Sequence, residues 1–200
     1  MNPEIRCPLF TEPTKPDAPL NIVWVNSFDE EKSKLFAESI YKASRENKDQ
    51  PIIVMIDSYG GSVYGIFHML SALDSVPNPI VTVVEGKAMS AGAILFSHGD
   101  HRFVTKHSRV MLHEIQAGAW GDIKDIRTTA KELERLNDYV MELTARNCGK
   151  DPVEFKKLFA GESRELYLSA QQAVDFGIAD YIGTPVVSKQ SFFMVGNSEE

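Results

Sequence analysis

The chain has 200 residues, of which 43% are hydrophobic and 24% are charged, and its formal net charge is -7. These values predict a single soluble globular domain that buries roughly 70% of the surface exposed by its unfolded chain. The acidic balance argues against non-specific binding to nucleic acid or to anionic lipid, because both require a basic face.

Cysteine usage and the N-terminus favour a cytoplasmic protein. Cys7 and Cys148 are the only cysteines, and neither lies in a metal-type cluster or a disulfide framework. No basic segment followed by an apolar run opens the chain, so we expect no secretory signal. The apolar stretches are too short to span a bilayer, and we expect no membrane partner.

The distribution of prolines indicates an N-terminal arm followed by one domain. Residues 1–20 contain five of the ten prolines, which fix φ and remove hydrogen-bond donors, so we expect an N-terminal arm without regular structure. The main domain is expected over residues 21–183. Residues 184–200 are expected to form a polar C-terminal tail that is loose at its end.

Apolar runs and helical spacing alternate along the domain. Near-continuous apolar runs predict buried strands at 21–26, 51–57 and 79–85, and two shorter strands are expected at 101–106 and 109–113. The first helix is expected to start from a Ser27 cap and to run to about Asn47, and the second carries Val63, Ile66, Leu70 and Leu73 at helical spacing. This alternation predicts an α/β protein whose sheet is covered on both faces.

Three helices are expected after residue 121. A long amphipathic helix is expected over about 122–147, and Pro152 is suited to the first position of a short helix. Ser169 and Gln172 form a capping box for another helix, which Gly177 ends. The long helix has more apolar surface than a monomer needs, so we expect it to contact another subunit through Leu133 and Val140.

Two glycine-rich turns each follow a buried strand, at 58–62 and 86–92. Taken alone, such turns are more often tight packing between strand and helix than functional loops. The second turn is the more suggestive, because Ser90 lies between small residues at a strand-to-helix junction. There the Ala91 amide can face developing negative charge, and a glycine of the first turn can supply a second N–H.

A serine hydroxyl needs a base that takes its proton. Of the five histidines, His113 ends an apolar strand, where catalytic side chains tend to project. His68 is expected on a helix surface. The other three, His98, His101 and His107, lie in or beside polar turns and are expected to be solvated. Spacing alone does not select the acid that would orient the base.

Five motifs in order resemble the ClpP family, the proteolytic subunit of the Clp protease, between about Val54 and Asp180. They are IDSYGGSV (56–63), GKAMSAGAILF (86–96), SRVMLHE (108–114), GDIKDI (121–126) with the helix that follows, and ELYLSAQQAVDFGIAD (165–180). They are similar to the family's Gly-Gly loop, nucleophile segment, histidine strand, ring-interlocking handle and acid segment. The resemblance implies a ClpP/crotonase-like α/β fold of repeated strand-strand-helix units.

The resemblance also assigns roles residue by residue. It implies Ser90 as nucleophile, His113 as general base and Glu165 as the acid, with oxyanion-hole amides from Gly61 and Ala91. No metal or organic cofactor is implied. Family members typically have Asp where this chain has Glu165, and an apparent insertion between Cys148 and Ser169 is one way to fit the longer side chain.

Two further departures lie beside the expected site, and a third lies at the N-terminus. Tyr59 replaces a usual proline, and Glu114-Ile115-Gln116 replaces a usual Gln-Pro pair. The first 50 residues match poorly, and in the family this region helps to form the axial pore and the docking surface for an AAA+ ATPase unfoldase. The sequence therefore fits a protein that works with an ATPase partner as well as one that works without it.

The expected protein is a serine endopeptidase that cleaves unfolded or extended polypeptides inside stacked homo-oligomeric rings, typically of seven subunits each. Three alternatives are considered: a catalytically inactive structural ring subunit, a specialised maturation peptidase that needs no ATPase, and a CoA-binding enzyme of the crotonase fold. The presence of both Ser90 and His113 disfavours the first, and a nucleophilic serine disfavours the last.

Overall fold

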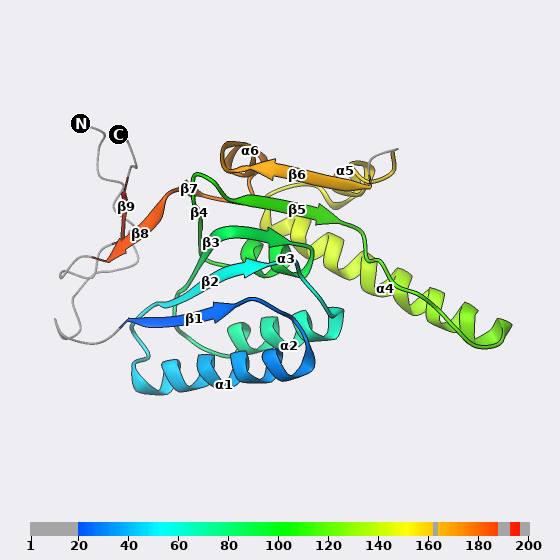
Figure 1. Cartoon of the computed structure of the whole chain (residues 1–200), viewed down its shortest axis with the longest axis horizontal. Coiled ribbons are helices and arrows are strands. Elements are labelled where there is room, and N and C mark those ends of the chain that lie inside the picture. The colour runs from blue at the N-terminus through cyan, green and yellow to red at the C-terminus, as the bar shows by residue number, and fades with distance from the viewer. Residues whose placement is uncertain (1–19, 162–163, 188–192, 197–200) are drawn as a thin grey trace.

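Apolar runs of the chain form the central strands of a parallel sheet, as the computed structural model shows (Figure 1). The structure describes residues 20–161, 164–187 and 193–196. Its strands are β1 (Asn21–Val25), β2 (Ile52–Ser58), β3 (Ile80–Met89), β4 (His101–Val104), β5 (Arg109–His113), β6 (Glu165–Ser169), β7 (Tyr181–Ile182), β8 (Thr184–Val187) and β9 (Phe193–Gly196). Its helices are α1 (Glu30–Glu46), α2 (Val63–Asp74), α3 (Ala91–Ser97), α4 (Ile123–Asn147), α5 (Pro152–Lys157) and α6 (Ala170–Phe176).

The sheet has two branches that share β3. Strands β1, β2, β3, β4 and β7 lie side by side in that order and are parallel. The first half of β3 pairs with β4, whereas its last residues, Lys87–Met89, pair with Arg109–Met111 of β5. Strand β5 then pairs with β6 in antiparallel orientation. Because β3 extends to Met89, four residues beyond the predicted strand, it reaches both branches.

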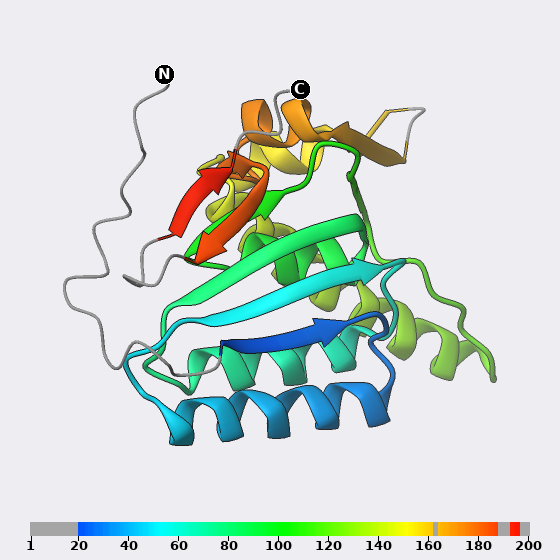
Figure 2. The ribbon, with the colours of Figure 1, turned by 60° about the vertical axis from the view of Figure 1, so that its left-hand side comes forward.

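Helices α1 and α2 pack beside one face of the sheet, as both views show (Figures 1 and 2). The main core lies on this side and includes Phe28, Phe36, Ile40, Val54, Ile66 and Phe96. A smaller buried cluster on the other face consists of Ile53, Val81, Val83 and Phe103. Burial of alternate residues on opposite faces explains why β2 and β3 are continuous apolar runs, and it confirms the α/β prediction.

Most of the predicted helix ends are confirmed. Asp122 caps α4, Asp151 caps α5 with Pro152 in the first turn, and α6 starts with the predicted capping box and ends at Gly177, whose φ is 88°. The prediction for α1 was wrong by two residues. Asp29, not Ser27, is its N-cap and accepts the Lys32 N–H at 2.8 Å.

Helix α4 projects away from the rest of the described chain (Figure 1). Its N-terminal half is exposed, with Ile123 at 70% and Ile126 at 42%. Val140, in contrast, is buried within this chain, which corrects the prediction that it contacts another subunit. A sequence pattern does not distinguish an apolar position that covers the chain's own core from one that covers a partner.

Arg102 joins β4 to two later segments. Its backbone N–H and its Nε donate to Asp180 at 2.8 and 3.0 Å, and its Nη1 donates to the carbonyl oxygens of Asn147 and Gly177. One guanidinium group therefore satisfies the carboxyl ends of α4 and α6 and a carboxylate before β7. This network attaches the last third of the domain to the central sheet.

The two chain ends lie partly outside the described residues. Of the arm predicted over residues 1–20, only Leu20 is described. The predicted tail contains β8 and β9, which pair with each other as a separate antiparallel sheet that the sequence reading did not foresee. Its last residues, 197–200, are not described.

Candidate active site

Ser90 occupies a strained turn between β3 and α3. Its φ and ψ are 55° and −122°, and it is the only described residue other than glycine with a positive φ. Strain of this kind persists only where the surrounding structure enforces it, and it is concentrated at functional sites. Here the Ser90 N–H donates to the Met111 carbonyl oxygen of β5 at 2.9 Å. This bond fixes the serine against the strand that carries His113.

The Gly60-Gly61 turn lies directly beside Ser90. A Cβ atom at Gly60 would lie 2.7 Å from Ser90 Cβ, 2.8 Å from the Met89 carbonyl oxygen and 3.1 Å from the Ala91 nitrogen. Only glycine permits this approach, and the sequence reading, which named Gly61, missed the contact made by Gly60. Two consecutive glycines were the available signal, but they do not tell which of the two makes the contact.

The expected oxyanion donors are free within the described chain. The Gly60 N–H donates to Ser58 Oγ at 3.1 Å, whereas no hydrogen bond among the described residues engages the N–H of Gly61 or of Ala91. A backbone N–H can donate to a developing oxyanion only if it does not already donate to another group. The environments of Gly61 and Ala91 thus suit that role, and that of Gly60 does not.

His113 lies on the face of the β5–β6 ribbon that points away from the core. Its neighbours Val110 and Leu112 point into the core, and so does Leu168 of β6. The His113 side chain is half-buried, and its Nδ1 is buried without a hydrogen bond in the described structure. Burial lowers the pKa of His113 from its ordinary value of 6.5 and outweighs the opposing effect of the Glu165 charge. The imidazole is therefore neutral at pH 7, as a general base must be.

Glu165 lies directly opposite His113 in the antiparallel ladder. Side chains at such paired positions start about 4.5–5.5 Å apart at their Cβ atoms. The Glu165 charge is close enough to raise the pKa of His113, although less than burial lowers it. The Tyr167 hydroxyl donates to Glu165 Oε2 at 2.9 Å. The nearest alternative acid, Glu162, lies outside the described residues.

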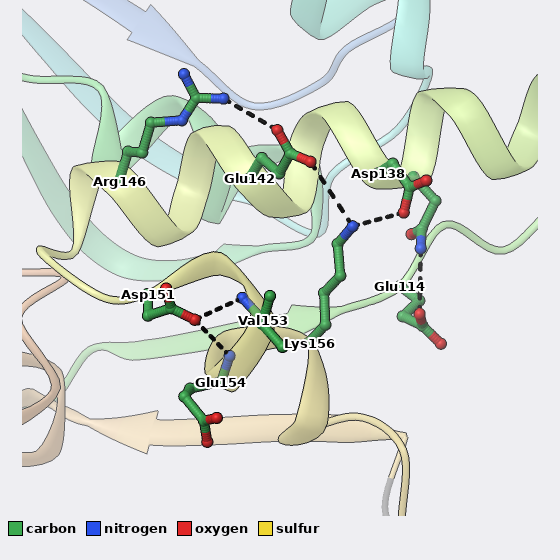
Figure 3. Close-up of polar contacts among 9 residues, drawn as sticks. Glu114, Asp138, Glu142, Arg146, Asp151, Val153, Glu154 and Lys156 are labelled. Carbon is green, nitrogen blue, oxygen red and sulfur yellow. Dashed lines mark hydrogen bonds and ion pairs between the residues drawn. The ribbon is translucent and has the colours of Figure 1, made fainter.

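The segment after His113 is attached to α4. Asn137 Oδ1 accepts the Ile115 N–H at 2.9 Å. Asn137 Nδ2 donates to Glu114 Oε1 at 3.1 Å, the bond that ends at the labelled Glu114 in Figure 3. Proline, usual in the ClpP family within the Gln-Pro pair, has no N–H to donate. Glu114 and Ile115 therefore allow two hydrogen bonds to Asn137 of α4, which the sequence alone did not predict.

Ion pairs hold helix α5, which precedes β6 in the chain, against α4. Lys156 Nζ lies 2.6 Å from Asp138 Oδ1 and 3.9 Å from Glu142 Oε1, and Arg146 also pairs with Glu142 (Figure 3). The Asp151 carboxylate accepts the first free N–H groups of α5 at 2.9 and 3.0 Å. These contacts fix the position of α5, the last described helix before Glu165.

Tyr59, which replaces the usual proline, contacts a charged pair. Lys87 Nζ lies 4.4 Å from the centre of the Tyr59 ring and 2.7 Å from Asp57 Oδ1. A cation over an aromatic face stabilises the ring's position. This contact orients the Tyr59 ring beside the Gly60-Gly61 turn.

The other four histidines lie outside β5, the strand that carries His113. His68 is exposed on α2, as expected, and His107 is exposed in a turn. The prediction that His98 is solvated was wrong, because its Nε2 lies 2.7 Å from Asp74 Oδ1 and only 19% of its side chain is exposed. His101, at the start of β4, is also half-buried.

Within the described ranges, no group of three or more His, Cys, Asp and Glu side chains is arranged to hold a metal ion. Among the described helices, none combines the length and apolar character needed to cross a membrane.

Comparison with known proteins finds one family model and several relatives that this chain resembles. Residues 19–186 match the family model described as Clp protease. The chain is 32% identical to the ATP-dependent Clp protease proteolytic subunit 1 of Leifsonia xyli subsp. xyli, over 80% of this chain and 82% of that protein. It is 34% identical to proteolytic subunit 3 of Rhodococcus jostii, over 73% and 71%. It is 33% identical to proteolytic subunit 1 of Rhodopirellula baltica, over 70% and 62%.

Proposed function

Because the chain belongs to the Clp protease family, we propose that it is an active serine endopeptidase in which Ser90, His113 and Glu165 form the catalytic triad. Its observed α/β architecture agrees with the ClpP/crotonase-like fold of that family. The observation that carries the proposal is the strand register. It sets Glu165 opposite His113, while Met111, two residues before the histidine, binds the backbone of Ser90.

In the proposed mechanism, His113 Nε2 takes the proton of Ser90 Oγ as the oxygen attacks the peptide carbonyl carbon. The N–H groups of Gly61 and Ala91 donate to the resulting oxyanion. His113 then gives its proton to the leaving amine as the C–N bond breaks, which leaves an acyl-Ser90 ester. Water, deprotonated by His113, attacks that ester, the acyl group leaves as a carboxylic acid, and His113 returns the proton to Ser90 Oγ. Glu165 accepts the Nδ1–H of His113 and so fixes the tautomer that exposes Nε2.

We also propose that the chain works in the cytoplasm, on unfolded or extended polypeptides, inside a ring-shaped homo-oligomer. The exposed apolar residues Trp120, Ile123 and Ile126 at the projecting end of α4 support subunit contacts there. The names of the relatives describe ATP-dependent proteases. An AAA+ ATPase is the corresponding partner proposed for this chain.

Labelling with a fluorophosphonate, followed by mass spectrometry, tests the nucleophile. Wild-type protein and the exposed-serine control Ser39→Ala should be labelled at Ser90 and should cleave a fluorogenic peptide. Ser90→Ala should lose both properties, with turnover reduced by several orders of magnitude, because nucleophile and base act as a unit. Ser90→Ala that keeps wild-type turnover would exclude this assignment. A wild-type protein that forms rings but neither reacts nor cleaves would be a structural subunit instead.

Two further variants test the acid and the assembly. Glu165→Gln should reduce kcat/KM by about 10²–10⁴-fold, and Glu162→Gln should have little effect; the reverse result would move the acid. Ile123→Asp with Ile126→Asp should split the particle in native mass spectrometry, because charges would then lie in an apolar contact. A double variant of wild-type size would show that the contact lies elsewhere.

A further inference from the structure

The outward face of the β5–β6 ribbon carries a third polar side chain beside the proposed base and acid. Along β6, Glu165 and Tyr167 lie on this face because they are two residues apart. Leu166 and Leu168, between and after them, pack toward the core. Tyr167 is 53% exposed, so its ring is not a core element, and its hydroxyl donates to Glu165 Oε2 at 2.9 Å.

A glutamate acid requires such a contact more than an aspartate does. Glu has one more rotatable bond than Asp, so its carboxylate explores more positions when nothing holds it. The backbone of Glu165 is fixed by its pairing with His113, but that pairing does not set the side-chain rotamer. A donor that lies on the same strand and binds one carboxylate oxygen does set it.

We propose that Tyr167 is a positioning residue that holds the Glu165 carboxylate beside His113. The inference rests on the proposed function, since it concerns the acid of that triad. Tyr167 touches neither substrate nor the reacting atoms in this role, and it acts only through Glu165.

A double-mutant cycle distinguishes this role from ordinary packing. The readout is the rate of fluorophosphonate labelling of Ser90 in the full-length protein. Tyr167→Phe should slow labelling about three- to tenfold, the equivalent of one net hydrogen bond. In the Glu165→Ala background the same substitution should leave the rate unchanged, because there is no carboxylate left to position. Tyr41→Phe, on α1, is the matched control and should have no effect in either background.

A second measurement does not depend on activity. Donation to the carboxylate raises the pKa of the Tyr167 phenol above its ordinary value of 10.0. Ultraviolet difference titration of the wild type against Tyr167→Phe isolates this phenol. Its titration should move to lower pH in Glu165→Ala, where the acceptor is gone.

The outcomes separate this inference from the proposed function. An equal slowing by Tyr167→Phe in both backgrounds, or no slowing in the wild type, overturns the positioning role while Ser90 remains the nucleophile. If wild-type Ser90 is not labelled at all, the proposed function fails. The titration then still decides whether Tyr167 binds Glu165. If Glu165→Ala leaves the pKa of the Tyr167 phenol unchanged, the proposed hydrogen bond is refuted.

Discussion

Gly60→Ala is the substitution whose effect follows most directly from the geometry of the site. An added Cβ would lie 2.7 Å from Ser90 Cβ, whereas ordinary contacts begin at 3.4 Å, so the turn and the serine must separate by about 0.7 Å. The backbone φ of Gly60 is +101°, a conformation that costs alanine about 1–2 kcal/mol. Overlap in a closely packed site adds about 1–3 kcal/mol. We expect the free energy of unfolding to fall by about 2–5 kcal/mol.

Activity should fall as well, because the displaced group is the proposed nucleophile. A shift approaching 1 Å at a reacting atom costs about 100-fold in rate. Gly149→Ala is the matched control, since Gly149 also has a positive φ, 66°, but nothing lies within 4 Å of an added Cβ. It should lose only about 1–2 kcal/mol of stability and keep full activity.

Urea denaturation and peptide hydrolysis, measured on both glycine variants at the same protein concentration, check these expectations. Gly60→Ala with a wild-type labelling rate at Ser90 would refute the argument that this glycine sets the position of the nucleophile. Equal losses of activity in Gly60→Ala and Gly149→Ala would show that general destabilisation, and not local displacement, is responsible.

Three other predictions concern the base, its supporting residue and the core. Burial lowers the pKa of His113, and the neutral form is the proposed base, so kcat/KM should fall on acidification with a midpoint below 6.5. A midpoint above that value in a pH–rate profile would contradict the assignment. Asn137→Leu removes both bonds to the segment after His113 and should lower kcat about three- to tenfold with little change in KM, whereas the exposed α4 control Glu134→Gln should match the wild type in the same steady-state assay. Arg102→Met removes the guanidinium donor from Asp180 and from two carbonyl groups, although the backbone N–H of residue 102 still donates to Asp180, and it should lower the unfolding free energy by about 3–5 kcal/mol. The exposed control Arg135→Met should change it by less than about 1 kcal/mol, and equal urea midpoints for the two would count against the Arg102 network.

Local signals determined most of the elements and the identity of the candidate residues. The buried strands β2 and β3, the Asp151-Pro152 start of α5 and the capping box of α6 depend on residues within a few positions of one another, and such patterns can be read directly. Ser90 was recognisable for the same reason, because a glycine-rich turn with Ala91 and Gly92 directly after the serine marks a tight strand-to-helix junction. The acid was assigned through the resemblance to the ClpP family, since no local pattern distinguishes Glu165 from the other acidic residues.

Only the tertiary structure decided how these parts meet. The pairing of β5 with β6 joins residues 52 positions apart, His113 and Glu165, and its register follows from Val110, Leu112 and Leu168 entering one core. The approach of Gly60 to Ser90 likewise depends on β2 and β3 being neighbours. Burial of Val140 in its own chain has the same origin, because an amphipathic pattern specifies a buried face but not what covers it. Contacts of this kind arise from long-range packing, and no short window of sequence contains both partners.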